Sequence, residues 1–345
     1  MKKVFALLLI LTLSGCSNSC SLFNNECVPI EEINKYIELG YKQETAEKIV
    51  LLSDETKDSY FNEYNSEFEQ IINCENFRER FLNEYDKNDI DIDTYLYLKE
   101  NNYDVNKKFL SFYKDPFFIL KNLDLYYKYE KDFRNVRLLV EYVNAKAYKK
   151  WYEEYEESDL TKGAFIIASK IYHLGDYVPT DLVNVENGYH LSKAPQLKKI
   201  AWQAYKAMAD AAKKEKVKFY IISAYRSYDS QKIIYNNYLK TDPQEVVDTY
   251  SSRYGFSDHQ IGLSIDIRSK KDETFDDFVN TKAYAWLKEN AYKYGFIQRY
   301  PKGKEKITGY MDEPWHYRYV GKDAAKIIYE NNITFDEYYA YYIEK

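Results

Sequence analysis

The chain has 345 residues, of which 45% are hydrophobic and 30% charged, a composition that excludes a largely disordered protein. Its formal net charge is -6 and it has no dense basic stripe, which excludes nucleic acid as the expected partner. Tyrosine is unusually frequent, with 39 residues. These could form aromatic platforms for sugar or peptide ligands, but they spread over the whole chain, and we favour a simple compositional bias.

The first residues have the pattern of an export signal. A basic start is followed by an apolar run over residues 4–13 and then by Ser14-Gly15-Cys16. This predicts a secretory signal peptide over residues 1–15, because the apolar run is too short for a permanent membrane-spanning helix. The sequence Leu-Ser-Gly-Cys resembles the lipobox of bacterial lipoproteins, which implies lipidation of Cys16 and cleavage before it. The alternative is an ordinary export signal with a chance cysteine.

Lipidation implies a protein anchored to the extracytoplasmic face of a bacterial cell membrane, where two acyl chains give stable attachment. Residues 16–30 then read as a tether. The remaining cysteines are Cys20, Cys27 and Cys74. Three is an odd number, so at most one intramolecular pair forms, and the pairing stays open.

Residues 31–156 have a helical pattern, with apolar residues three and four positions apart. Two segments, 37–54 and 98–115, are distantly alike, and each suggests an apolar helix, a turn and a second helix. These are either repeated helical hairpins or a chance similarity. No catalytic constellation is found in this region. We interpret it as an interaction or spacer module, which could bind another protein.

The texture changes after residue 162, where Gly, Pro and short β-branched runs appear. We expect helices over 194–214, 227–239 and 281–294, and two more at the end of the chain. Strands are expected over 217–224, at the end of 257–267 and over 315–320. Without regular βαβ alternation, this predicts an α+β domain over residues 162–345. The first helix is expected to bury one side, composed of Leu197, Ile200, Ala204, Met208 and Ala211.

Two of the four histidines stand in sequences that can bind metal. His259 lies seven residues before Asp266, and His316 follows further along the chain. Two imidazoles and a carboxylate match the three protein ligands of a catalytic zinc site, which keeps one position open. Glu313, three residues before His316, is a natural general base beside such a site. By spacing alone, an ordinary surface pair remains the alternative, and the helical His-Glu-x-x-His signature is absent.

Several motifs in order carry a family resemblance over about residues 165–330. Residues 257–266 (SDHQIGLSID) and 313–321 (EPWHYRYVG) resemble the Ser-x-His-x-x-Gly-x-Ala-x-Asp and Glu-x-Trp-His motifs of VanY-type D-alanyl-D-alanine carboxypeptidases. Residues 223–228 (SAYRSY) and 294–301 (YGFIQRYP) are also similar to segments of that family. The resemblance implies a zinc peptidase fold, with a small antiparallel sheet and flanking helices.

Carried over by position, the resemblance gives each motif residue a role. It implies one zinc ion and a metallo-carboxypeptidase. Arg226 would hold the substrate or polarise its scissile carbonyl, because the guanidinium offers paired donors. The implied metal ligands are His259, Asp266 and His316, the base is Glu313, and the substrate contacts are Ser257, Gln231, Tyr300 and Trp315.

Some positions depart from the family pattern. Ser264 stands where alanine is usual, Asp258 replaces a common glutamate, and Ala224 replaces a common glycine. Asp312 precedes Glu313 where an aromatic residue is frequent, and like-charge repulsion between the two is expected to raise the pKa of Glu313. No implied metal ligand is missing.

The resemblance implies removal of a C-terminal D-alanine from peptidoglycan stem peptides. An LD-carboxypeptidase acting on tetrapeptide stems is the alternative within enzymes. A cell-wall-binding lipoprotein that keeps the fold without activity is the alternative outside them. His173 and His190 belong to no motif, and we interpret both as structural.

Overall fold

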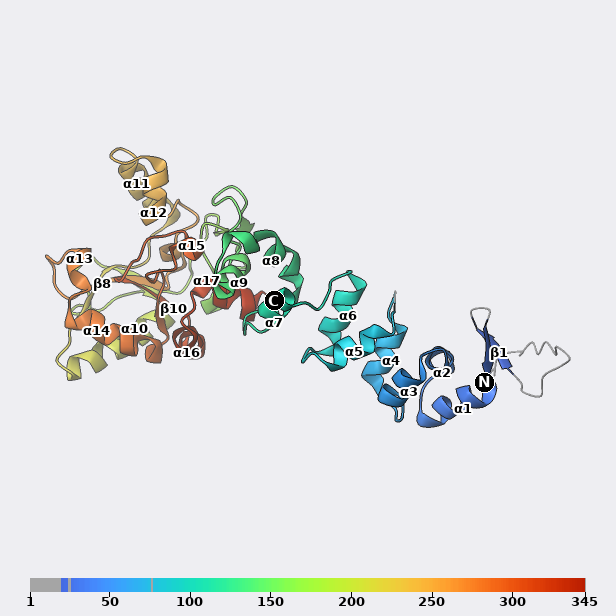
Figure 1. Cartoon of the computed structure of the whole chain (residues 1–345). Coiled ribbons are helices and arrows are strands. Elements are labelled where there is room, and N and C mark those ends of the chain that lie inside the picture. Colours follow the sequence, from blue (N-terminus) through green and yellow to red (C-terminus); the bar gives the residue numbers. More distant parts are fainter. Residues whose placement is uncertain (1–19, 24–25, 76, 345) are drawn as a thin grey trace, which may run out of the picture. The chain divides into compact units, whose positions relative to one another are not determined.

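The computed structural model describes residues 20–23, 26–75 and 77–344, so the expected signal peptide and Cys16 lie outside the described residues. By its internal contacts the chain forms two compact units, residues 1–111 and 112–345 (Figure 1). The boundary therefore lies ahead of the expected one, which separated residues 31–156 from 162–345. No helix among the described residues is long and apolar enough to cross a membrane.

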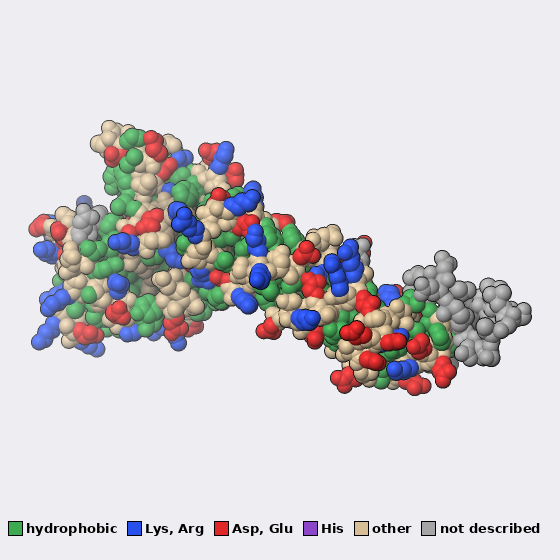
Figure 2. All heavy atoms as spheres, in the orientation of Figure 1, with side chains coloured by type: hydrophobic (Ala, Val, Ile, Leu, Met, Phe, Trp, Pro, Cys, Tyr) green, Lys and Arg blue, Asp and Glu red, His purple; other side chains and the backbone are tan. Residues whose placement is uncertain are grey.

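The first unit is a strand pair followed by short helices. The strands pair in an antiparallel hairpin, in the segment expected to be a tether. Acidic side chains are prominent on the face of this unit that Figure 2 shows. The elements are β1 (Cys20–Phe23), β2 (Glu26–Pro29), α1 (Ile30–Leu39), α2 (Gln43–Val50), α3 (Asp54–Tyr60), α4 (Ser66–Asn73), α5 (Arg80–Asp86), α6 (Ile92–Glu100) and α7 (Lys107–Tyr113), which crosses the boundary.

The two similar segments of this unit share one kind of turn. Gly40, with φ +112°, ends α1, and Asn102, with φ +60°, follows α6. In both cases the next residue is a tyrosine whose backbone N–H bonds five residues back, from Tyr41 to the Tyr36 carbonyl at 3.1 Å and from Tyr103 to the Leu98 carbonyl at 2.7 Å. This closure satisfies the last carbonyls of each helix in the same way. The similarity of the two segments thus extends to their backbone.

By their contacts, residues 112–157 belong to the second unit, although their helical sequence pattern resembles that of the first unit. They hold η1 (Leu120–Asn122), α8 (Leu123–Tyr129), η2 (Glu130–Asp132) and α9 (Val136–Asn144). The ammonium of Lys304 lies 2.8 Å from a carboxylate oxygen of Glu141 on α9. The Tyr152 and Tyr310 hydroxyls are hydrogen-bonded at 2.9 Å. Helical periodicity reports the local conformation but not the packing partner, so the sequence pattern could not locate this boundary.

A four-stranded antiparallel sheet is the centre of the second unit. It consists of β7 (Tyr220–Ser223), β8 (Ser264–Arg268), β10 (His316–Tyr319) and β9 (Phe296–Gln298), in that spatial order. Two small pairs flank it: β3 (Glu156–Glu157) with β4 (Tyr172–His173), and β5 (Leu182–Asn184) with β6 (Gln196–Lys198). The helical elements are η3 (Gly163–Phe165), α10 (Lys199–Lys214), α11 (Tyr228–Tyr238), α12 (Gln244–Tyr250), η4 (Asp258–Ile261), α13 (Phe275–Phe278), α14 (Lys282–Asn290), η5 (Ala291–Tyr294), α15 (Glu305–Thr308), α16 (Lys322–Asn331), α17 (Phe335–Tyr338) and the π-helical η6 (Tyr339–Ile343). The α+β prediction is confirmed.

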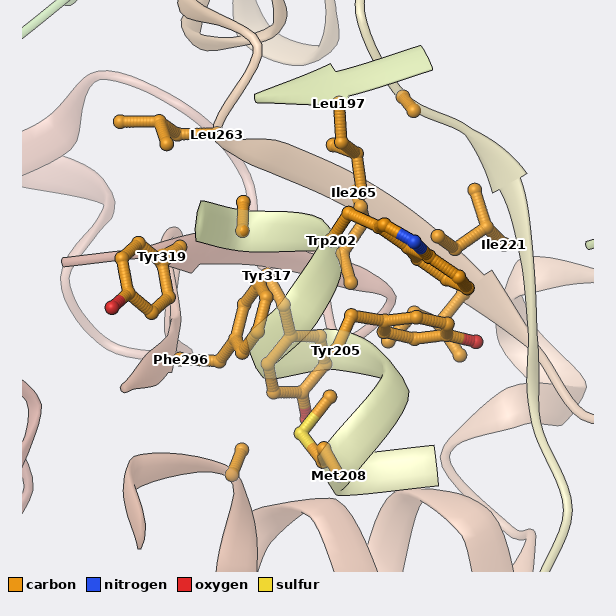
Figure 3. Close-up of a cluster of buried hydrophobic side chains, with 14 of the residues drawn as sticks. Leu197, Trp202, Tyr205, Met208, Ile221, Leu263, Ile265, Phe296, Tyr317 and Tyr319 are labelled. Atoms are coloured by element: carbon orange, nitrogen blue, oxygen red, sulfur yellow. The ribbon is translucent and has the colours of Figure 1, made fainter. Parts of the chain in front are cut away.

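One face of the sheet packs on α10, and Figure 3 shows this core. Alternation along β8 places Ile265 and Ile267 in the core and sends Asp266 to the other face. The buried side of α10 differs from the expected one by one position. Ile200 is 49% exposed, and the buried residues are Ala201, Trp202, Tyr205, Met208 and Ala212. The strand face opposite this core is free to carry polar side chains.

Candidate active site

Strand register brings two of the expected metal ligands together. His316 on β10 is directly paired with Asp266 on β8. Paired residues share a face of the sheet, and here the His316 Nδ1 and Asp266 Oδ1 atoms are 3.2 Å apart. His259, from η4, completes the group with its Nε2 atom 3.3 Å from Asp266 Oδ2. The three side chains are buried, and their ligand atoms lie within 4.8 Å of one another.

Gly262 makes the turn from η4 into β8. Its φ of +76° is a left-handed conformation that favours glycine. A Cβ atom here would lie 2.9 Å from a methyl carbon of Leu182. The glycine of the motif therefore lets the chain turn sharply between His259 and Asp266.

The ring nitrogens of the histidines point in defined directions. His259 Nδ1 lies 2.7 Å from the Ala224 carbonyl, which makes Nδ1 the protonated nitrogen and leaves Nε2 to face Asp266. His259 Nε2 and Asp266 Oδ1 are buried without a hydrogen-bond partner. Buried polar atoms are rarely left unpaired in proteins. Two imidazole nitrogens and one carboxylate that converge in this way, with ligand atoms left unpaired, fit a zinc ion with one open position.

Glu313 lies beside this cluster but on its own loop. One carboxylate oxygen is 3.4 Å from His316 Nδ1. Burial, together with the nearby Asp266 carboxylate, raises the pKa of Glu313 to about 7 against the opposing effect of His316. The like-charge effect expected from Asp312 is not among the main causes, because the Asp312 carboxylate instead accepts a 2.8 Å hydrogen bond from Gln298. A carboxyl group with this pKa can accept and return a proton near neutral pH.

A cavity of about 710 Å³ opens beside the cluster. Arg226 lines it, and its guanidinium donates a 2.8 Å hydrogen bond to Gln231. A second guanidinium nitrogen is 3.8 Å from Asp266. Gln231 is almost fully buried and donates to the Ser252 carbonyl at 2.7 Å. Gln231, expected to bind substrate, therefore also positions Arg226.

The remaining expected contacts line the same cavity. Ser257 is buried at the start of η4. The ring of Tyr300 lies 5.1 Å from that of His316, and its buried hydroxyl has no hydrogen-bond partner. Trp315 is only partly buried at the wall. The structure thus gathers around one cavity all the site residues that the sequence suggested, except Cys16, which lies outside the described residues.

The sequence analysis missed part of the cavity wall. Ile234 and Tyr238 of α11, Tyr250 of α12 and Met311 also line it. Apolar residues on short helices carry no recognisable signal, because they look like ordinary core positions. His173 and His190 are not among the residues that line the cavity.

Comparison with known proteins agrees with the motifs. Residues 194–322 match the family model VanY, D-alanyl-D-alanine carboxypeptidase. The solved structure of the LdcB LD-carboxypeptidase is 41% identical, with a TM-score of 0.50, over 56% of this chain and 92% of that one. The chain belongs to the VanY family. The VanY domain accounts for β6 to the start of α16, so the first unit lies outside it.

Two curated relatives extend the comparison. A putative carboxypeptidase, YodJ of Bacillus subtilis (strain 168), is 44% identical over 50% of this chain and 66% of its own length. A D-alanyl-D-alanine carboxypeptidase of Enterococcus faecium is 35% identical over 55% of this chain and 61% of its own length. The chain spans somewhat less than two thirds of each relative.

Proposed function

We propose that the second unit is a zinc-dependent carboxypeptidase that removes a C-terminal D-alanine from peptidoglycan stem peptides. The proposal rests on one observation, the buried His259–Asp266–His316 cluster beside Glu313 in an open cavity. Membership of the VanY family supports the choice of substrate. The two curated relatives carry carboxypeptidase names as well.

The protein groups around the cavity have distinct tasks in this reaction. Zinc, when bound by His259, Asp266 and His316, supplies Lewis acidity and lowers the pKa of a coordinated water. Glu313 accepts the proton of the attacking water and then delivers it to the nitrogen of the departing D-alanine. The Glu313 carboxylate lies 3.4 Å from His316 Nδ1, so it is placed beside the three ligand side chains for both transfers.

Two further side chains face the substrate. Arg226 presents guanidinium donors to the scissile carbonyl or to the terminal carboxylate. Its hydrogen bond to Gln231 keeps the guanidinium in the cavity without a substrate. Burial holds the pKa of Tyr300 well above its ordinary value, so its free hydroxyl stays a hydrogen-bond donor.

A Glu313→Gln variant tests the assignment of the base. We expect it to bind zinc stoichiometrically but to lose about 10²- to 10⁴-fold in kcat, the usual contribution of a general base. Mass spectrometry of defined stem peptides incubated with zinc-loaded protein measures the turnover. Glu305→Gln, at an exposed carboxylate of α15, is the matched control and should keep full activity. Wild-type turnover by the Glu313 variant would contradict the proposal, and a wild-type protein that binds no zinc would favour the non-catalytic wall-binding alternative.

An LD-carboxypeptidase is the second candidate, favoured by the 41% identity with LdcB. It would cleave the bond after an L-configured centre in a tetrapeptide stem. Both reactions use the same water and base, so the cluster does not separate them. A DD-carboxypeptidase shortens the stem peptide that ends in two D-alanines, and an LD-carboxypeptidase shortens the one that ends in a single D-alanine, so the masses of the remaining peptides distinguish the two activities.

We also propose that the protein is lipid-anchored at Cys16 and works on the extracytoplasmic face of the membrane. The support is the lipobox-like Leu13-Ser14-Gly15-Cys16 sequence, and a peptidoglycan substrate requires an extracytoplasmic location. A Cys16→Ala variant should leave the membrane fraction; unchanged fractionation would count against lipidation. The first unit is proposed as a spacer or protein-binding module between the anchor and the enzyme.

A further inference from the structure

Asp258 lies beside the group of proposed metal ligands, directly before His259 in the sequence, and is 1% exposed. Its Oδ2 atom accepts a hydrogen bond from the Ser264 hydroxyl and is 3.5 Å from His316 Nε2. Its Oδ1 atom accepts a hydrogen bond from Arg318 and is 3.9 Å from Nε of Arg299. One buried carboxylate thus contacts a metal-ligand ring, a hydroxyl and two guanidinium groups.

The orientation of the His316 ring determines which of its two nitrogens faces Asp258. The Nδ1 atom faces Asp266 at 3.2 Å and Glu313 at 3.4 Å, which is the side where a metal would be held. The opposite nitrogen, Nε2, is buried without a hydrogen-bond partner, and Asp258 lies on that side. A neutral imidazole binds metal through the nitrogen that carries no proton. His316 can therefore bind through Nδ1 only if its proton is on Nε2.

Asp258 is suited to accept that proton as a hydrogen bond. Its oxygens face donors from three side chains, the guanidinium groups of Arg318 and Arg299 and the Ser264 hydroxyl. A carboxyl group placed among such donors is a carboxylate, which can only accept hydrogen bonds. A histidine ligand that donates its second N–H to a carboxylate is fixed in tautomer and ring orientation.

The carboxylate is itself held in place by buried groups. Arg318 also donates to the Ala164 and Ile166 carbonyls, at 3.0 and 2.7 Å. Arg299 is bound bidentately by Asp336 of α17. Both guanidinium groups are fully buried, so neither can turn away from Asp258 without losing several hydrogen bonds.

Ser264 links two of the departures from the family pattern. Aspartate replaces a common glutamate at 258, and serine replaces the usual alanine at 264. In the structure the Ser264 hydroxyl donates to Asp258, and Ser264 is fully buried. This hydrogen bond fixes the direction of the Asp258 carboxylate.

We propose that Asp258, aimed by Ser264, is a positioning residue that holds His316 in the Nε2-protonated tautomer required for metal binding through Nδ1. This rests on the metal site of the proposed function but not on which peptide is cleaved. Metal binding therefore tests it independently of turnover.

The first test measures zinc affinity by competition with a chromophoric chelator. Asp258→Asn should weaken zinc binding about 10- to 100-fold, the usual effect of removing such a partner. The matched control is Asp312→Asn, a carboxylate next to Glu313 that binds Gln298 instead of a metal ligand, and it should keep wild-type affinity. An Asp258 variant that keeps wild-type zinc affinity would overturn the proposal, even if the enzyme proves active.

A second test remains valid if Asp258→Asn fails to fold. Ser264→Ala removes the aiming hydroxyl alone and should weaken zinc binding a few-fold. Asp258→Glu should crowd Ser264, and the double variant Asp258→Glu/Ser264→Ala should recover affinity because the lost hydroxyl makes room for the extra methylene. Strictly additive losses in this cycle would overturn the coupling of the two residues. Nitrogen-15 chemical shifts of His316 should report a protonated Nε2 in the wild type and a changed tautomer balance in Ser264→Ala; no change would also contradict the proposal.

Discussion

At the residue scale, the site depends on where single side chains and single backbone angles direct their neighbours. The sequence suggested His259, Asp266, His316 and Glu313, and the structure places all four around one cavity. It could not show which ring nitrogen of each histidine faces the cluster. That choice is made by the Ala224 carbonyl for one ring and by Asp258 for the other, and these contacts join positions 35 and 58 residues apart. Spacing along a motif carries no information on such contacts.

Gly262 gives the residue-scale prediction. In Gly262→Ala the new Cβ would meet Leu182, and the alanine would also adopt a positive φ. Gly303→Ala is the matched control, because Gly303 has a similar φ of +86° but nothing within 4 Å of a Cβ. Both should lose about 1–2 kcal/mol of unfolding free energy from the left-handed backbone. Gly262→Ala should lose additional unfolding free energy because of the contact with Leu182, which thermal denaturation measures. It should also bind zinc less tightly than Gly303→Ala, which chelator competition measures. Equal losses in the two variants would show that the contact with Leu182 is unimportant.

At the scale of elements, the pairing register of β8 and β10 determines the geometry of the site more than any sequence motif does. Strands β7 and β10 lie within the predicted ranges 217–224 and 315–320, and β8 ends one residue beyond the predicted 257–267. Helices α10, α11 and α14 are present as expected, but residues 196–198 of the predicted helix 194–214 form β6, and β9 was not predicted. Direct pairing of His316 with Asp266 was not predictable, because nothing in either strand alone sets its partner or register. The one-position error on α10 has a similar cause. Ile200 looks like a core residue by its chemistry, but β6 directly before the helix sets the rotation at which α10 meets the sheet.

The hairpin of α11 and α12 forms the outer wall of the cavity. Its own hydrophobic side chains are partly exposed, with Ile233 at 63% and Val246 at 43%, and Figure 2 shows hydrophobic surface in this region. The hairpin is tied together by Asp248, which accepts hydrogen bonds from Tyr235 at 2.7 Å and from Arg253 at 2.7 and 3.1 Å. Asp248 acts beside the contact of the Tyr238 and Tyr250 rings at 5.1 Å and the hydrogen bond from Gln231 to the Ser252 carbonyl, so its removal should loosen the wall without detaching it.

Asp248→Asn should therefore loosen this wall without changing the three proposed metal ligands. The amide keeps one acceptor but loses the charge that binds the guanidinium of Arg253, an interaction typically worth about 1.5–3 kcal/mol. We expect KM for stem peptides to rise about 10-fold while kcat changes less and zinc affinity stays constant. Asp229→Asn, an exposed carboxylate of the same hairpin, is the matched control. A fall in kcat at constant KM would instead indicate that the hairpin acts on the chemical step.

At the scale of the whole molecule, the second unit begins well before the VanY domain that it contains. Residues 112–157 carry no motif, yet their side chains pair with buried groups elsewhere in the second unit. Lys304 is shared by Glu141 at 2.8 Å and Glu337 at 3.3 Å. Lys170 lies over the rings of Trp151 and Tyr310, each at 4.6 Å, and burial lowers its pKa to about 8.

These contacts predict where the chain can be shortened. A fragment of residues 112–345 keeps Glu141, Trp151 and Tyr152, so it should fold, bind zinc and retain the melting temperature of the enzyme unit. A fragment of residues 158–345 leaves Lys304 with one carboxylate fewer and exposes Tyr310, whose hydroxyl loses its 2.9 Å partner. Each unpaired buried polar group costs about 1–3 kcal/mol, so the shorter fragment should melt several degrees lower or fail to fold. Glu141→Gln in the full chain isolates one of these contacts and should lower the melting temperature by a smaller amount. If both fragments melt at the same temperature and bind zinc equally, residues 112–157 belong with the first unit in function, and the family domain is sufficient by itself.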